Sequence, residues 1–553
     1  MRPVRAAIAG VLALGVGAFG CNGSGEAAAP ELSPAATPPL CSDAEVTVLA
    51  SPRRMRRLGD RELADVLGDV IGAPVTPGTD LLGDPQVDGW ETDARAFVVS
   101  GPKLDGYLSL VTSLAPAVAR RAGCEPLEAA RTCAARFAKT IATRAFGRPP
   151  TAEELVDLLG VFDAGVTSEG ADAGFRLVAE AILLAPSTLY RSEVGAPAAG
   201  EVAAGGAVSA AEVKLTDYEL ASQLSFLFSG SRPDDALLAA AERGELSDPK
   251  NAVAQATRLL AMPRARVQVE HMVEGWLGLG KLETTRRSSA FPEMTPAVLA
   301  AMQDELRRFV DHVVFEGSGT LDELLGSSTS YPTAALVPIY GADLLAAPSD
   351  GAAVPLDPNH RRGLLSLPAF LTGHASYDAT SPVDRGLFVR TRLFCQQIGA
   401  PPAVAFTMPV SAGADDGTTT RQKFEQHSTD PMCKGCHSQM DPVGFGLEGF
   451  DAIGRFRTVE HGLPVDDSGF LTDADVVGRF RGPAQLAELV SKSEDARTCF
   501  VAQVMRFAEG SSPAALCEVR PLDDRFMTSG RRITDLLLAY VARHEFYVRR
   551  VTP

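Results

Sequence analysis

The sequence predicts a mainly α protein made of several small helical domains, with a short β-hairpin element near the C-terminus. Apolar residues recur at helical spacing in most segments, helix-capping patterns precede several of these segments, and strand patterns are few. The chain has 553 residues, which is too long for one hydrophobic core. We therefore expect three or more domains.

The helices are predicted from apolar faces and from capping residues. Residues 51–72 place five apolar side chains on one helical face: Leu63, Val66, Leu67, Val70 and Ile71. Thr151 with Glu154, and Thr216 with Glu219, have the spacing of a capping box, in which each residue satisfies a backbone N–H of the other. Each pair predicts the start of a helix.

The strand prediction is confined to residues 458–472, TVEHGLPVDDSGFLT. Alternating apolar residues there predict a hairpin with its turn at Asp467-Ser468-Gly469. Asp466 and Asp467 are weak candidates for binding calcium, and a plain turn is the simpler interpretation. The Gly- and Ala-rich residues 196–211 predict a linker.

Net charge and composition exclude some classes of partner. The formal charge is −17, with 45% hydrophobic and 22% charged residues. This composition is ordinary for a globular protein. The negative charge argues against non-specific binding to nucleic acid or to an anionic membrane surface.

The N-terminus predicts export. Arg2 and Arg5 precede an apolar run over residues 6–19, which is too short to span a bilayer and has the form of a secretory signal. Small residues before Cys21 resemble a bacterial lipoprotein cleavage site, so we expect Cys21 to carry lipid. A plain signal peptide and an uncleaved anchor are the alternatives. No later segment is long and apolar enough to cross a membrane.

Export changes the interpretation of the nine cysteines, because disulfides persist in an oxidising compartment. Short separations favour a Cys124–Cys133 bridge and a Cys499–Cys517 bridge. A bridge between Cys41 and Cys395 follows only by elimination.

Cys433, Cys436 and His437 form a C-x-x-C-H motif. On one helical turn they share a face, which suits thioether bonds to the two vinyl groups of haem and binding of iron by the histidine. Asp441-Pro442 is expected to end this helix. The apolar residues that follow are candidates to wall the haem: Phe445, Leu447, Phe450, Ile453 and Phe456.

Three other interpretations of the motif compete with a c-type haem. A zinc site needs four ligands, and no second cysteine or histidine cluster accompanies the motif. A thioredoxin-like redox pair expects a βαβ setting, which the sequence lacks. A structural disulfide between Cys433 and Cys436 is the third. Export favours haem, because c-type haem is attached outside the cytoplasmic membrane.

The segment RQKFEQHSTDPMCKGCHSQMDPVGFGLEGFDAIGRFR resembles the cytochrome c-like module of exported multi-domain proteins of unknown function common in planctomycetes and myxobacteria. Further segments resemble other modules of that family, among them CAARFAKTIATRAFGRPPTAEEL, LTDYELASQLSFLFSGSRPDDALLAAAERGEL and TSPVDRGLFVRTRLFCQQIGAPP. The resemblance implies export and one covalent haem c. It supplies no substrate.

The predicted organisation follows from these segments. It comprises a signal peptide (1–20), a lipoprotein tether (21–50), an N-terminal helical module (51–120), a second helical module (121–195), a linker (196–211), a central helical module (212–345), a cytochrome c-like haem module (346–460) and a C-terminal helical module (461–553).

The second axial ligand of the iron is not evident. His427 matches a histidine of the family pattern and is a candidate distal ligand, while Met408 and His374 are weaker ones. Met440 lies on the same helical face as His437 and is expected to pack. Arg455 and Arg457 are candidates to pair with haem propionates. An open sixth position is the remaining possibility.

Together these observations predict an exported lipoprotein of the cell envelope, on the periplasmic face or outer membrane, that transfers electrons to a partner the sequence does not identify. One alternative is a haem-dependent oxidoreductase with an open axial site. The other is a structural or binding lipoprotein in which Cys433 and Cys436 form a disulfide.

Overall fold

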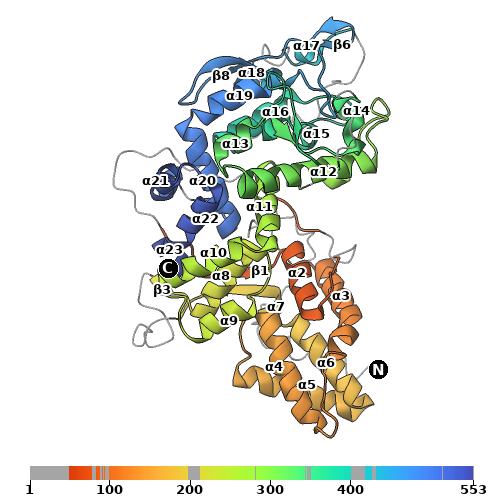
Figure 1. The fold of residues 1–553 in the computed structure, drawn as a ribbon. Coiled ribbons are helices and arrows are strands. Elements are labelled where there is room, and N and C mark those ends of the chain that lie inside the picture. The colour runs from red at the N-terminus through yellow and green to blue at the C-terminus, as the bar shows by residue number, and fades with distance from the viewer. Residues whose placement is uncertain are drawn as a thin grey trace.

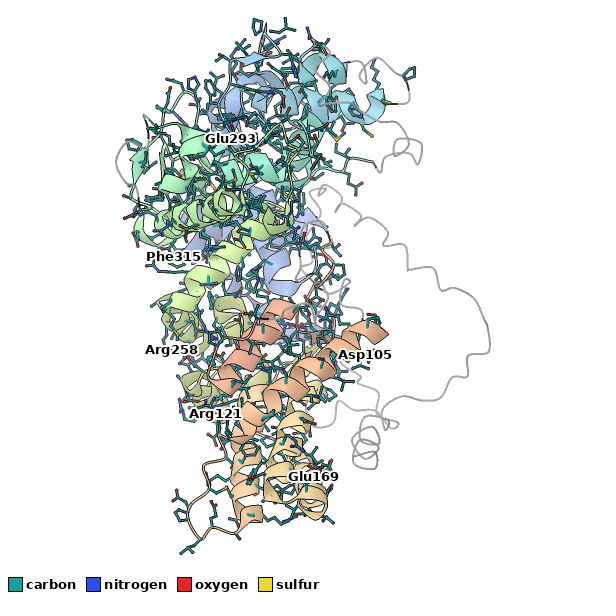
Figure 2. All side chains as sticks on the ribbon, turned by 90° about the vertical axis from the view of Figure 1, so that its right-hand side faces the viewer. Asp105, Arg121, Glu169, Arg258, Glu293 and Phe315 are labelled. Carbon is teal, nitrogen blue, oxygen red and sulfur yellow. A yellow bond between two sulfur atoms is a disulfide. The ribbon has the colours of Figure 1, made fainter. Side chains whose placement is uncertain are left out.

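The computed structural model describes residues 49–76, 83–87, 90, 93, 99–196, 212–280, 282–342, 344, 350–399, 417–425, 431, 433–513 and 515–551. These residues form a mainly α protein, as predicted. The molecule is elongated in both views (Figures 1 and 2). In Figure 2, Glu293 lies toward one end and Glu169 toward the other. Each described sheet is a two-stranded antiparallel pair.

The N-terminal lobe, residues 49–193, is a helical bundle beside one strand pair. Its elements are β1 (Arg54–Arg57), α2 (Asp60–Ile71), α3 (Gly101–Ala119), α4 (Ala130–Phe146), α5 (Ala152–Glu169), α6 (Ala171–Leu184), α7 (Pro186–Leu189) and β2 (Tyr190–Glu193). The predicted capping box is present at α5, where the Glu154 N–H donates to Thr151 Oγ1 and the Thr151 N–H donates to Glu154 Oε2.

The middle region is built from two separate parts of the chain, residues 212–280 and 494–551 (Figure 1). The first part supplies β3 (Glu212–Lys214), α8 (Asp217–Ser229), α9 (Asp235–Glu242), α10 (Pro249–Leu260) and α11 (Pro263–Trp276). The second supplies α20 (Glu494–Glu509), η11 (Leu516–Val519), α21 (Arg520–Thr528), α22 (Ile533–Val541), α23 (His544–Tyr547) and β10 (Val548–Arg550). The capping box of Thr216 and Glu219 opens α8 as predicted.

The upper lobe, residues 282–491, carries the C-x-x-C-H motif on α18 (Lys434–Gly444). Its other helices are η3 (Leu282–Thr284), α12 (Pro296–Asp311), η4 (His312–Glu316), α13 (Leu321–Gly326), η5 (Ala334–Leu336), α14 (Val337–Tyr340), η6 (Leu364–Ser366), α15 (Pro368–Gly373), α16 (Pro382–Phe388), η7 (Val389–Leu393), α17 (Thr420–Glu425), η10 (Phe445–Leu447) and α19 (Gly482–Ser491). Its strands are β4 (Thr329–Ser330), β5 (Val354–Pro355), β6 (Val459–Glu460), β7 (Leu463–Pro464), β8 (Ser468–Leu471) and β9 (Gly478–Arg481).

Two hydrophobic cores hold most of these elements. One lies among α2 to α6 of the N-terminal lobe. The other is continuous through the middle region and the upper lobe, from Leu220 of α8 to Phe546 of α23. The upper lobe therefore shares its interior with the middle region.

The C-terminal strand ties the middle region to the N-terminal lobe. β10 pairs with β3, and the Arg53 N–H donates to the Arg550 carbonyl at 3.2 Å. The buried Arg549 guanidinium contacts Glu193 of β2 at 3.2 Å and Gln223 of α8 at 2.8 Å. These long-range contacts fix the two ends of the described chain together.

The predicted hairpin is present, but its turn is elsewhere. β6 and β7 are joined by His461 and Gly462, both with positive φ (48° and 79°). Two such residues form the tight turn that matches strand twist, whereas Ser468 begins β8, which pairs with β9. The predicted turn at Asp467-Ser468-Gly469 is therefore wrong.

Two helix boundaries also differ from prediction. The helix expected over residues 51–72 begins at Asp60, because β1 occupies Arg54–Arg57. α18 does not end at Asp441-Pro442 but continues through Pro442 to Gly444. Proline removes one backbone donor and frees the carbonyl four residues earlier, at the exposed Ser438, where water can satisfy it.

Within the described residues, no helix has both the length and the apolar character needed to span a bilayer.

Candidate functional site

Helix α18 positions the C-x-x-C-H motif at the surface of the upper lobe. Cys433 is the N-cap residue, and its carbonyl accepts the N–H groups of Cys436 (3.3 Å) and His437 (3.1 Å). The three side chains thus occupy positions i, i+3 and i+4 of one turn, as the spacing predicts, and all are half-buried. The motif lies on an ordered helix while remaining accessible.

The C-terminal half of α18 is buried against α16 at two glycines. A Cβ at Gly386 would stand 2.0 Å from the Met440 carbonyl oxygen, and one at Gly444 would stand 1.8 Å from the Pro382 carbonyl oxygen. Only glycine permits such close backbone contact. The segment TSPVDRG begins the helix α16, which holds the motif helix in place.

His437 is bound by a buried carboxylate. Its Nδ1 lies 2.9 Å from Asp441 Oδ2 and 3.1 Å from Oδ1, one helical turn further along α18. Asp441 is 1% exposed. With Nδ1 engaged in this way, coordination of a metal falls to Nε2.

Cys433 and Cys436 are not disulfide-bonded, in contrast to the five other cysteines that the structure describes. The predicted Cys124–Cys133 bridge is present. Both remaining predicted pairings are wrong, because Cys395 is bonded to Cys499. Cys517 is disulfide-bonded as well.

The helix between Cys499 and Cys517 explains the wrong pairing. From Cys499 to the end of α20 the chain rises about 15 Å, so nearness in sequence is not nearness in space. Cys499 is fully buried, and its Cα lies 5.4 Å from that of Cys395, which follows η7. Cys21 and Cys41 lie outside the described residues.

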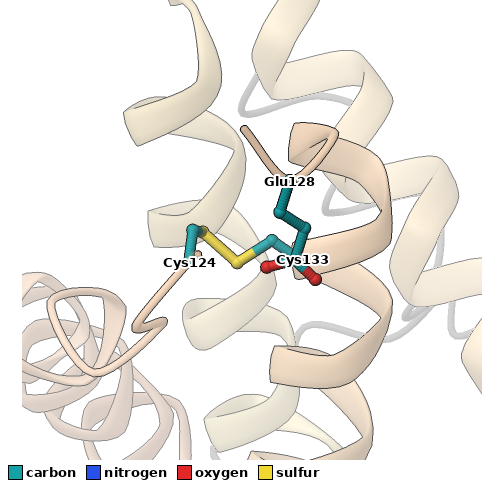
Figure 3. Close-up of side chains that lie close together, drawn as sticks. All are labelled: Cys124, Glu128 and Cys133. Carbon is teal, nitrogen blue, oxygen red and sulfur yellow. A yellow bond between two sulfur atoms is a disulfide. The ribbon is translucent and has the colours of Figure 1, made fainter. Parts of the chain in front are cut away.

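The described residues contain one cluster with the composition of a metal site, formed by Cys124, Glu128 and Cys133 (Figure 3). Its two sulfur atoms are joined to each other, and Glu128 is paired with Arg136 at 2.8 Å. A disulfide offers no thiolate to a metal. Among the described residues, this is the cluster with such a composition, and it does not include Cys433 or Cys436.

The apolar residues after the motif form the protein interior. Leu447, Phe450 and Ile453 are at most 1% exposed and belong to the large core, and the guanidinium of Arg361 stacks on Phe450. Phe445 packs in a small cluster with Ala379 and Phe424. Phe456, in contrast, is 39% exposed and stacks on His360. The four buried side chains pack the protein interior next to the motif helix. Whether any of the five contacts a haem stays a prediction.

Both arginines proposed for propionates already have carboxylate partners. Arg455 pairs with Asp451 (2.7 Å) and Glu293 (2.8 Å). Similarly, Arg457 pairs with Glu448 at 3.0 Å and with Glu460 at 2.9 Å. The calcium candidates Asp466 and Asp467 also pair with arginine, at Arg421 and Arg481.

The structure describes one of the three distal-ligand candidates, His374. His374 Nε2 contacts the Leu277 carbonyl at 2.8 Å, its ring packs between Phe370 and Phe388, and burial lowers its pKa to about 4. It is a half-buried histidine that packs on core aromatic rings. Met440 is 6% exposed and packs, as expected. His427 and Met408 lie outside the described residues.

The sequence alone did not indicate the buried ion pair between Arg385 and Glu448, which supports the site. Arg385 of α16 is fully buried and donates to the carbonyls of Leu447, Phe450 and Asp451. Its guanidinium lies 3.4 Å from Glu448, whose pKa is raised by burial. The arginine stands inside TSPVDRG, but only the three-dimensional contacts show that it is internal.

Comparison with protein families places three domains on the chain. Residues 133–193 match PSD5 (DUF1595), residues 215–342 match PSD4 (DUF1592), and residues 361–460 match PSCyt3 (DUF1588). Each is described as a protein of unknown function, and the families are related to cytochrome c. The matches support a multi-domain protein of this kind. No curated protein and no solved structure matches significantly.

Proposed function

We propose that this chain binds one haem covalently, through thioether bonds from Cys433 and Cys436 and an axial bond from His437. The observation that carries the proposal is the placement of two unbonded thiols and one histidine on a single half-exposed helical turn. The motif also lies within the region that matches PSCyt3.

The donor set fits the chemistry of attachment. Each thiol adds across one vinyl group, so that its S–H bond breaks, an S–C bond forms and the hydrogen goes to the neighbouring vinyl carbon. No oxidant or reductant is consumed. The iron, when bound, supplies one-electron chemistry. The chain supplies a fixed helix, two thiols and an imidazole whose Nδ1 is held by Asp441.

The role that follows is electron transfer in the cell envelope, with the chain anchored by lipid on Cys21. A haem-dependent oxidoreductase with an open axial site uses the same residues and is the first alternative. A structural or binding lipoprotein with a Cys433–Cys436 disulfide is the second. The unbonded state of the two thiols favours attachment over that disulfide.

The test is production of the exported protein together with haem-maturation factors. We expect one haem per chain by intact mass, and haem staining that survives a denaturing gel. The double variant Cys433→Ala/Cys436→Ala loses both signals. The matched control is Cys124→Ala/Cys133→Ala, which removes a cysteine pair elsewhere and leaves staining in place. Wild-type protein without covalent haem would support the disulfide alternative.

Binding of carbon monoxide separates the two haem functions. A carrier with both axial positions filled by protein does not change its spectrum with carbon monoxide. An enzyme with an open sixth position does, and it reacts with peroxide as well.

A further inference from the structure

Within α18, the carboxylate of Asp441 contacts the imidazole ring of His437. Its oxygens lie 2.9 and 3.1 Å from His437 Nδ1, and the i, i+4 spacing on α18 sets this contact. The histidine side chain is 21% exposed and the aspartate side chain 2%. The carboxylate is thus on the interior side of the ring.

The surroundings keep Asp441 in this position. Its neighbour Met440 is pressed against Gly386, and Gly444 is pressed against Pro382, so this part of α18 cannot shift without a backbone clash. A carboxylate removed from water needs hydrogen-bond donors, and the imidazole N–H supplies one. The contact is therefore a stable property of the fold.

A carboxylate behind a metal-bound histidine has two chemical effects. It selects the tautomer that carries its proton on Nδ1, which leaves the Nε2 lone pair for the metal. It also makes the imidazole a stronger electron donor, because the shared proton is drawn toward the carboxylate. A stronger donor stabilises ferric iron more than ferrous iron.

We propose that Asp441 is a positioning residue for the haem, which orients His437 and lowers the reduction potential of the iron. This inference rests on the proposed function. In the redox step, a reduced haem held here would pass one electron to an acceptor protein, so that its iron goes from ferrous to ferric, the acceptor is reduced and no bond to His437 breaks. The haem is therefore suited to donate electrons onward, and its partner would be an acceptor of higher potential.

The test compares Asp441→Asn with wild type in haem-loaded protein. Asparagine has nearly the same shape, and its amide oxygen still accepts the Nδ1 proton, but the negative charge is gone. We expect the equilibrium constant for reduction to rise at least tenfold, which is about 59 mV for a one-electron couple. Asp441→Glu, which keeps the charge, restores most of the wild-type potential.

Asp467→Asn is the matched control. It removes the same charge from the same lobe, at a residue paired with Arg481 rather than with His437. In this variant, the equilibrium constant for reduction should stay within twofold of the wild-type value. An equal shift in both asparagine variants would mean that net charge alone acts, and would overturn the role of Asp441.

A second measurement does not need haem. Nitrogen NMR of ¹⁵N-histidine in the haem-free protein should show His437 with its proton on Nδ1 in wild type, and a loss of that preference in Asp441→Ala. Haem uptake with an unchanged potential in Asp441→Asn overturns this inference alone. A protein that takes up no haem overturns the proposed function and this inference with it.

Discussion

Gly386 of α16 and Met440 of α18 are in backbone contact. A Cβ at position 386 would stand 2.0 Å from the Met440 carbonyl oxygen, and 3.2 Å from the Gly444 nitrogen. The helix that carries Cys433, Cys436 and His437 is thus held by the absence of a side chain on its neighbour. The close contact between the two backbones therefore helps to set the orientation of the motif helix.

Gly386→Ala should therefore destabilise the upper lobe and displace the motif. The methyl group meets backbone atoms on a buried helix, which cannot move aside as a side chain end would. We expect a loss of several kcal/mol in the free energy of unfolding, in the range of severe overpacking. Urea unfolding followed by circular dichroism measures it.

Gly435→Ala is the matched control for that substitution. Gly435 lies on α18 itself, between the two cysteines, and a Cβ there meets nothing within 4 Å. Alanine is the better helix former by about 1 kcal/mol, so this variant should be equal to or more stable than wild type. Equal losses from the two substitutions would contradict the packing argument.

The Cys395–Cys499 disulfide should contribute more to stability than the Cys124–Cys133 disulfide. The Cys395–Cys499 bridge joins residues that are 104 apart in sequence, and the loop it closes contains the whole of α18. The Cys124–Cys133 bridge joins residues with a separation of only 9. Loop-closure entropy assigns on the order of 5 kcal/mol to the longer loop and about 3 kcal/mol to the shorter.

Paired serine variants of each bridge test this order by denaturant unfolding. Non-reducing peptide mapping is the direct check on connectivity. A peptide that links Cys499 to Cys517 would refute the bridge described here.

Local patterns carried most of the correct predictions. The capping boxes at Thr151 and Thr216 depend on residues three apart, and both are formed. The face of α2 was also recognisable, because Leu63, Val66 and Leu67 are buried at helical spacing. These features are decided by neighbours in sequence.

The errors concern contacts between distant segments. Residues 458–472 contain two stretches that could form a turn. Ser468 belongs to a strand because β8 pairs with β9, which no local pattern indicates. Cys395 and Cys499 are brought together by the packing of η7 on α20. Arg385 looks like a surface arginine until its carbonyl partners are known. The C-x-x-C-H spacing is visible in the sequence, but the contacts that hold its helix in place are not.

Lipid attachment at Cys21 is a prediction from the sequence alone. Cys21→Ala should move the protein from the membrane fraction to the soluble fraction, because a small residue replaces the cysteine that accepts lipid. Fractionation with immunodetection measures it, with Cys124→Ala as the cysteine control. Unchanged membrane association of the Cys21→Ala protein would count against a lipid anchor.

The last prediction concerns the buried carboxyl of Glu305 on α12. Glu305 is fully buried, and its Oε1 accepts hydrogen bonds from Ser330 Oγ and Tyr340 Oη, each at 2.6 Å. Burial raises its pKa from 4.5 to about 7, even though these hydrogen bonds and the nearby Arg361 favour the ionised form. The folded protein therefore holds a proton that the unfolded chain releases near pH 4.5.

Between about pH 4.5 and pH 7 the native state binds more protons than the unfolded state, so stability from this group is full below that window and is lost as pH rises through it. The loss is roughly 3 kcal/mol for a gap of this size. Glu305→Gln mimics the protonated acid and should remove this part of the dependence. Urea unfolding of both proteins at pH 5 and pH 8 measures the difference. Parallel pH profiles for the two proteins would show that Glu305 is ionised in the native state throughout.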